Sequence, residues 1–129
     1  MNIGRTTLLS ILAIGLFAAC GQSGTGGAIA PAAFKKAITA DAQLIDVRTP
    51  AEFIGGHLPN ARNLDWTSGQ LESSMASLDK NAPVLLYCAS GKRSAAAREA
   101  LIKAGFTDVH DLDGGIRAWS ASGGEIVND

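Results

Sequence analysis

Short apolar segments alternate with amphipathic ones along most of the chain. The continuous apolar run at 84–87 is typical of a strand buried on both faces of a sheet. Shorter segments predict further strands over 43–47, 61–64 and 109–112. Apolar positions at helical spacing, with proline at the start or glycine at the end, predict helices over 31–38, 49–54, 71–78, 94–104 and 115–119. This alternation predicts an α/β domain with a central, mostly parallel sheet and helices on both faces.

The first 19 residues do not follow that pattern. A basic start that includes Arg5 precedes a run of 12 apolar or small residues over 8–19. A membrane-spanning helix needs about 20 apolar residues, so this run is too short and is typical of a secretory signal.

The end of this segment, Leu16-Phe17-Ala18-Ala19-Cys20, resembles a bacterial lipoprotein signal, although Phe17 stands where leucine is usual. The resemblance implies cleavage before Cys20, a lipid on Cys20 and attachment to a membrane in the bacterial periplasm. Gly21 after the cysteine favours the outer membrane. The alternative is a plain signal peptide with an incidental cysteine.

These features divide the chain into four parts. We predict a signal peptide over 1–19, a glycine-rich flexible tether over 20–30, one folded domain over 31–123 and a C-terminal tail over 124–129. The length of 129 residues suits one domain and not two.

Charge and composition narrow the function. The formal net charge of −1 gives no basic excess of the kind that indicates nucleic-acid binding. The two histidines lie at no zinc-ligand spacing from a cysteine or from each other, so we expect neither a metal site nor a cofactor. Of the two cysteines, a lipid on Cys20 would leave Cys88 as the only free thiol in an oxidising compartment. Cys88 is then either a buried, inert side chain or a reactive one.

The loop after Cys88 favours the reactive alternative. Gly91 lets the backbone curl so that several N–H groups point inward, and the start of a helix adds partial positive charge. Lys92 and Arg93 add two cations. These features lower the pKa of a thiol and also bind an anion.

Several segments, in order, resemble the rhodanese family of single-domain sulfurtransferases. Residues 44–53 and 56–63 resemble its first signature, 87–94 its active-site loop, and 105–106 and 112–119 its closing signatures. The resemblance implies that Cys88 takes the outer sulfur of a donor such as thiosulfate, releases sulfite, and passes the sulfur from a persulfide to cyanide or a thiol. It also implies that the substrate is held by the loop residues Ala89, Ser90, Gly91, Lys92 and Arg93.

Other residues near this loop have supporting roles in this interpretation. We expect Asp46 to hydrogen-bond to the backbone near the loop, and Arg48 to form an ion pair with Glu52. Trp66 could lie in the core or at the rim of the pocket.

Two other functions remain open from the sequence. One is a non-catalytic or dedicated sulfur-carrier module at the membrane, which serves a protein partner. The other is a cysteine-dependent phosphatase or arsenate reductase. The chain also resembles phosphatases of this fold, in which five residues stand between the catalytic cysteine and an arginine. In this chain only four residues stand between Cys88 and Arg93. The shorter loop encloses a smaller volume, which suits one sulfur atom better than a phosphate.

Overall fold

The computed structural model describes residues 24–129, so the predicted signal peptide and Cys20 lie outside the described residues. Five strands form one sheet in the order β1-β5-β4-β2-β3, and every neighbouring pair is parallel. The strands are β1 (Thr25–Ile29), β2 (Gln43–Asp46), β3 (Arg62–Asn63), β4 (Val84–Tyr87) and β5 (Asp108–Leu112). The prediction of a parallel α/β sheet is confirmed.

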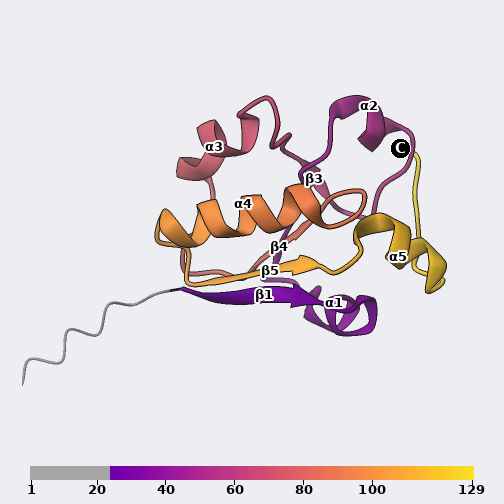
Figure 1. Cartoon of the computed structure of the whole chain (residues 1–129), viewed down its shortest axis with the longest axis horizontal. Coiled ribbons are helices and arrows are strands. Elements are labelled where there is room, and N and C mark those ends of the chain that lie inside the picture. The colour runs from indigo at the N-terminus through magenta and orange to yellow at the C-terminus, as the bar shows by residue number, and fades with distance from the viewer. Residues whose placement is uncertain (1–23) are drawn as a thin grey trace, which may run out of the picture.

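Helices cover both faces of this sheet, with α4 above β4, β5 and β1 and α1 at the lower side of the molecule in Figure 1. The helices are α1 (Pro31–Ala37), α2 (Pro50–Ile54), α3 (Gln70–Ser74), the 3-10 turn η1 (Met75–Ser77), α4 (Lys92–Lys103) and α5 (Gly115–Ala121). Side chains of the strands alternate between two buried clusters. One contains Leu71 of α3 and Leu101 of α4. The other contains Phe34 of α1 and Trp119 of α5. Each face of the sheet therefore has its own hydrophobic core.

The strand β1 corrects the predicted tether. Residues 25–29 pair with β5 along their whole length, from Thr25 beside Asp108 to Ile29 beside Leu112. Gly26 permits close packing here, and this strand is not a flexible segment. A Cβ on Gly26 would lie 1.7 Å from the carbonyl oxygen of Val109. The folded domain therefore begins before residue 31.

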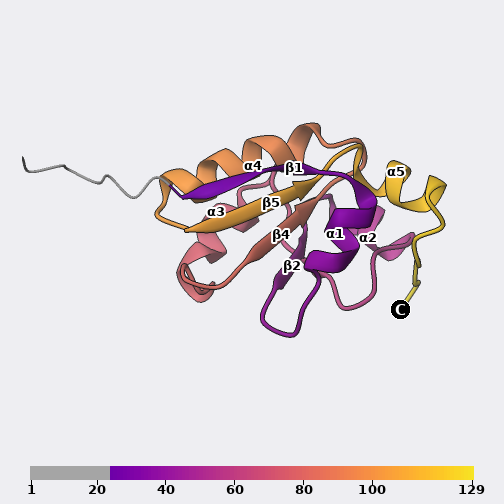
Figure 2. The same cartoon turned by 90° about the horizontal axis from the view of Figure 1, so that it is seen from below.

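The predicted C-terminal tail packs against the domain. The indole N–H of Trp119 donates to the carbonyl oxygen of Glu125 at 2.9 Å. Val127 and His57 exchange two backbone hydrogen bonds of 2.9 Å each. Figure 2 shows the end of the chain on the same side of the molecule as α5. Within residues 24–129, no helix combines the length and apolar character needed to cross a membrane.

Candidate active site

Cys88 lies directly after β4, where the carboxyl ends of the parallel strands meet. Its side chain is buried, with 1% of the residue exposed. The backbone N–H of Gly91 donates to the Cys88 sulfur at 3.1 Å. Gly91 has a φ of +103° and caps the N-terminus of α4, a conformation that a residue with a side chain rarely adopts. The glycine thus turns the chain so that a backbone donor points at the thiol.

The surroundings of the thiol favour its ionised form. Burial raises the pKa of Cys88, but hydrogen bonds from the Ser94 side chain and from the backbone N–H groups of Ser94, Gly91 and Ser90 outweigh burial, so the pKa is lowered overall. A thiolate and not a thiol is the nucleophile, so this lowered pKa suits a reactive cysteine.

The first turn of α5 supports the loop from behind. The N–H of Ile116 donates to the carbonyl oxygen of Cys88 at 2.8 Å, and the N–H of Arg117 donates to that of Ala89 at 3.2 Å. Gly115 allows this close approach, since a Cβ there would lie 2.5 Å from the backbone carbonyl of Ala89. The start of α5 therefore holds the loop through two of its carbonyl groups.

Arg93 forms a bidentate ion pair with Glu52 of α2, with N–O distances of 2.8 and 2.9 Å. The hydrogen bond from Arg93 lowers the pKa of Glu52 to about 2. Glu52 also completes a capping box with Thr49, whose side chain accepts from the Glu52 N–H at 3.2 Å. The loop is thereby fixed to the start of α2.

The predicted ion pair between Arg48 and Glu52 is wrong. Arg48 binds the carboxylate of Asp46 through Nε and Nη2, with the shortest contact at 2.6 Å, and donates to the carbonyl oxygen of Gly56 at 2.7 Å. Arg48 precedes α2, so its separation of four residues from Glu52 does not place the two side chains on one helical face. Asp46 accepts the backbone N–H of Arg48 at 2.9 Å, which agrees with its expected bond to the backbone.

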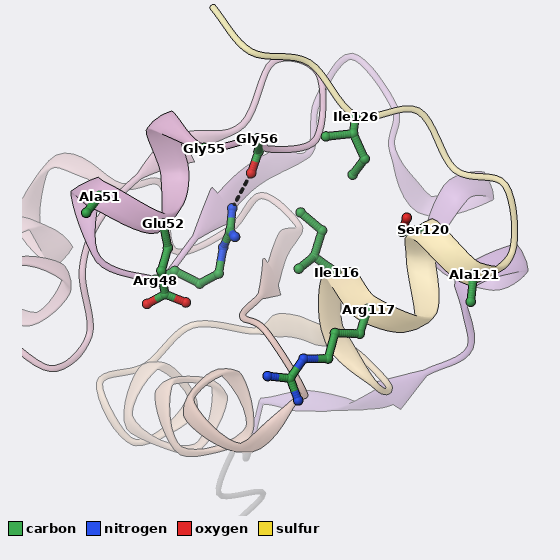
Figure 3. A pocket seen from close by; sticks show the side chains of 10 residues that line it. All are labelled: Arg48, Ala51, Glu52, Gly55, Gly56, Ile116, Arg117, Ser120, Ala121 and Ile126. Atoms are coloured by element: carbon green, nitrogen blue, oxygen red, sulfur yellow. Dashed lines mark hydrogen bonds between the residues drawn. The ribbon is translucent and has the colours of Figure 1, made fainter.

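An open cleft of about 680 Å³ lies between α2, α5 and the C-terminal segment (Figure 3). Glu52 and Gly56 line one wall, while Ile116 and Arg117 line the other. Both walls are joined to the Cys88 loop by the hydrogen bonds described above. Figure 3 shows Arg48 turned toward the carbonyl oxygen of Gly56 and Arg117 on the α5 side. The exposed Arg117 brings positive charge to this cleft.

The model of the rhodanese-like domain family matches residues 30–122. The chain belongs to this family. Its relatives include the uncharacterized protein YqhL of Bacillus subtilis, which is 44% identical over 85 residues. That match covers 66% of this chain and 64% of YqhL, so the chain spans less than two thirds of that relative's length. The thiosulfate sulfurtransferase GlpE of Pseudomonas aeruginosa is 35% identical over 98 residues, which cover 76% of this chain and 87% of GlpE.

Solved structures of rhodanese-like proteins share the fold. A rhodanese-related protein from Thermoplasma volcanium matches with a TM-score of 0.71 and 31% identity, over 79% of this chain and 98% of that one. A thiosulfate sulfurtransferase from Pseudomonas aeruginosa matches with a TM-score of 0.67 and 28% identity, over 80% of this chain and 20% of that one.

The remaining predicted site residues of this rhodanese-like domain differ in their surroundings. Lys92 is exposed at the start of α4, and Ser90 is exposed in the loop. Trp66 is half-buried against the core cluster that contains Leu101, so it lies at the edge of the core.

No group of three or more histidine, cysteine, aspartate or glutamate side chains that could hold a metal occurs in residues 24–129. The sequence interpretation missed Gly115, because its role depends on contact with a loop 26 positions earlier in the chain.

Proposed function

We propose that this protein is a sulfurtransferase that moves a sulfane sulfur from a donor such as thiosulfate to cyanide or a thiol through a persulfide on Cys88. The observation that carries this proposal is the Cys88 sulfur itself, which is held 3.1 Å from the Gly91 N–H in a loop that lowers the thiol pKa. Membership of the rhodanese-like family supports it, as do relatives named thiosulfate sulfurtransferase.

In the first half of the reaction, the Cys88 thiolate attacks the outer sulfur of thiosulfate. A new bond forms between the Cys88 sulfur and the outer sulfur of thiosulfate. The bond between the outer sulfur and the central sulfur of thiosulfate breaks, and its electron pair stays on the central sulfur, which leaves as sulfite. The negative charge moves from the Cys88 sulfur to the transferred sulfur. Backbone N–H groups of the loop from Ala89 to Arg93 are then available to this outer atom.

The donor is a dianion, so positive charge near the loop matters. Arg93 is already paired with Glu52. Lys92 makes no ion pair with any residue in the described part of the chain and is exposed beside the loop. We therefore assign the attraction of the donor chiefly to Lys92, with Arg93 acting as a fixed part of the loop wall.

In the second half of the reaction, the acceptor attacks the outer sulfur and the thiolate of Cys88 leaves. The acceptor is cyanide or a thiol, which a small molecule or a partner protein could provide. This two-step scheme requires no cofactor, and it predicts ping-pong kinetics.

The test is incubation of the full chain with thiosulfate, followed by intact mass measurement and a sulfite assay. We expect the gain of one sulfur atom and release of sulfite, both absent in Cys88→Ser. Addition of cyanide should then remove the extra sulfur and release thiocyanate. An adduct that no acceptor removes would favour a dedicated carrier. The absence of both adduct and sulfite would contradict the proposal.

We also propose that the chain is exported to the bacterial periplasm and anchored to a membrane, with the outer membrane favoured, through a lipid on Cys20. The pattern of residues 1–20 supports this. Only residues 21–24 lie between Cys20 and β1, and this segment spans at most roughly 15 Å when fully extended. Since β1 and β4 run in the same direction, Cys88 would then lie at the end of the sheet that faces away from the membrane. Cys20→Ser should release the folded protein from membranes, and a variant that still fractionates with them would refute the lipid anchor.

A further inference from the structure

The cleft between α2, α5 and the C-terminal segment is larger than an inorganic substrate needs. Its volume of about 680 Å³ lies within the range of about 300–1,000 Å³ that is typical of sites for organic small molecules. A water molecule takes up roughly 30 Å³ in the liquid, and thiosulfate, sulfite and cyanide are only a few such volumes in size. The cleft therefore has room for an organic part that none of these ions possesses.

The lining of this cleft is mostly apolar. Its apolar side chains come from three separate parts of the domain, namely Ala51 of α2, Ile116 and Ala121 of α5, and Ile126 of the C-terminal segment (Figure 3). Ile126 is 38% exposed, so most of its surface is covered and it forms a wall of the cleft. Burial of a hydrocarbon chain against such walls is favourable.

Ile126 is held in place although it lies near the end of the chain. On one side of it, the carbonyl oxygen of Glu125 accepts from the indole of Trp119 at 2.9 Å. On the other side, Val127 exchanges two backbone hydrogen bonds of 2.9 Å with His57. Residue 126 also lies outside the range 30–122 that the family model matches, so this wall is an addition to the matched domain.

Arg117 supplies the one charge of the cleft that the described part of the chain leaves without a partner. Arg48 is bound to Asp46 and Glu52 to Arg93, so those charges are neutralised within the protein. Arg117 is exposed and forms no ion pair among residues 24–129. Apolar walls with one free cation complement a molecule that has a hydrocarbon chain and one negative group.

The two helical walls of the cleft meet at the Cys88 loop. The N–H of Ile116 donates to the carbonyl oxygen of Cys88 at 2.8 Å. On the other wall, the carboxylate of Glu52 is bound to Arg93 at the far end of the loop. A molecule in the cleft therefore lies next to the loop that would carry the persulfide.

We propose that Ile126, together with the rest of the cleft, determines which thiol accepts the sulfur, and that it favours a small organic thiol with a hydrocarbon chain and a negatively charged group. This inference rests on the proposed function and names its acceptor. Arg117 attracts the charged group, and the apolar walls cover the chain. In a two-step scheme the sulfite has left before the acceptor arrives, so the same cation is free for the acceptor.

The transfer step needs no further reactant. The thiolate of the acceptor attacks the outer sulfur of the Cys88 persulfide, and a bond forms between these two sulfur atoms. The bond between the outer sulfur and the Cys88 sulfur breaks, and its electron pair returns to Cys88. The acceptor leaves as a persulfide, so nothing outside the pair is oxidised or reduced.

The test isolates this second half of the reaction. The full chain is loaded with thiosulfate, desalted and mixed with 4-mercaptobutanoate, 6-mercaptohexanoate or 8-mercaptooctanoate. Intact mass measurement follows the loss of the extra sulfur, with each rate expressed per thiolate and relative to cyanide, which has no chain to bind. We expect the rate constant to rise roughly two- to fourfold for each added CH₂ group. The uncharged 6-mercaptohexanol should react roughly two- to fivefold more slowly than 6-mercaptohexanoate.

Two pairs of variants assign these preferences to residues. Ile126→Ser should remove most of the dependence on chain length, whereas Ile54→Ser should keep it, because Ile54 is 70% exposed on α2 and does not line the cleft. Arg117→Gln should remove the preference for 6-mercaptohexanoate over 6-mercaptohexanol. Arg62→Gln should keep that preference, because Arg62 is an exposed arginine of β3 outside this cleft.

The outcomes separate this proposal from the proposed function. Rates that do not depend on chain length, or the same dependence in Ile126→Ser as in the unchanged protein, overturn the proposal even when cyanide removes the sulfur. Octanoate tests the cleft without sulfur transfer, because it has the chain and the charge but no thiol. It should shift the backbone amide NMR signals of Gly56, Ser120 and Ile126, which line the cleft, and should bind more weakly to Ile126→Ser. Shifts confined to other residues, or no binding, overturn the proposal whether or not the protein takes up sulfur.

Discussion

The ion pair between Arg93 and Glu52 joins the Cys88 loop to α2, and Glu52→Gln is the change that isolates its contribution. Glutamine at this position preserves the capping box with Thr49, because its amide oxygen still accepts from the Thr49 backbone. The substitution therefore removes one negative charge and one of the two hydrogen bonds from Arg93, because the amide nitrogen cannot accept from Nη2.

The size of the effect follows from the pKa of Glu52 and from its exposure. A carboxylate whose pKa falls from 4.5 to about 2 on folding would stabilise the protein by at most about 3 kcal/mol. The side chains of Glu52 and Arg93 are 35% and 29% exposed, so water screens much of this interaction. Exposed pairs contribute up to about 1 kcal/mol. We therefore expect Glu52→Gln to lower the free energy of unfolding at pH 7 by about 1 kcal/mol.

The effect should depend on pH with a definite sign. Folding lowers the pKa of Glu52, so the unfolded chain takes up the proton first as the pH falls. The stabilisation is complete above about pH 4.5 and is lost as the pH falls toward about 2. Urea unfolding followed by tryptophan fluorescence at several pH values measures this. The difference between the two proteins should shrink steadily below pH 4.5.

Two outcomes would refute this reasoning: a difference that is the same at pH 3 and pH 7, or a variant that is more stable at pH 7. Glu99→Gln is the control. Glu99 is an exposed carboxylate of α4 that forms no ion pair among residues 24–129. Its substitution should change the free energy of unfolding by less than about 0.5 kcal/mol at every pH.

Two further substitutions test the support of the loop and the core, both by urea unfolding. Gly115→Ala should lower the free energy of unfolding by more than about 2 kcal/mol and should slow alkylation of Cys88 by iodoacetamide, because the alanine Cβ would collide with the backbone carbonyl of Ala89. Gly123→Ala is the matched control, because Gly123 has a similar positive φ but open space around it. It should lower the free energy of unfolding by only about 1–2 kcal/mol. Phe34→Ala should cost about 3–5 kcal/mol, because Phe34 is wholly buried and packs edge-on against Trp119; a loss below about 1 kcal/mol would contradict this assignment.

The sequence was sufficient for the inner strands of the sheet and for the position of Cys88, because both depend on local patterns. The apolar run at 84–87 and the helix after it position Cys88 at the end of a strand, and this prediction needs no information about distant parts of the chain. The edge strand β1 could not be found in this way. Its residues are mostly small and three of its five residues are exposed, so no hydrophobic period marks it. Only its pairing partner, β5, reveals that Gly26 serves close packing.

The contacts around the thiol were harder to predict because they join distant parts of the chain. Arg93 and Glu52 are separated by 41 positions, and Ser94 and Asp111 by 17. Opposite charge alone does not select these partners, since several arginines and acidic residues gather at this end of the sheet, with Asp65 also near Arg93. The structure pairs Arg48 with Asp46, Arg93 with Glu52, and Arg98 with Asp111.

This pairing changes which cations can attract an anionic donor. Each of the three arginines already neutralises a carboxylate, so none offers a full positive charge to a ligand. Lys92 and Arg117 are exposed and form no ion pair among residues 24–129, and they stand on the two elements, α4 and α5, that hold the loop. Positive charge on exposed side chains attracts an anion over a distance that salt shortens. The proposal is therefore that the paired arginines fix the shape of the loop, while the exposed cations bring the donor to Cys88.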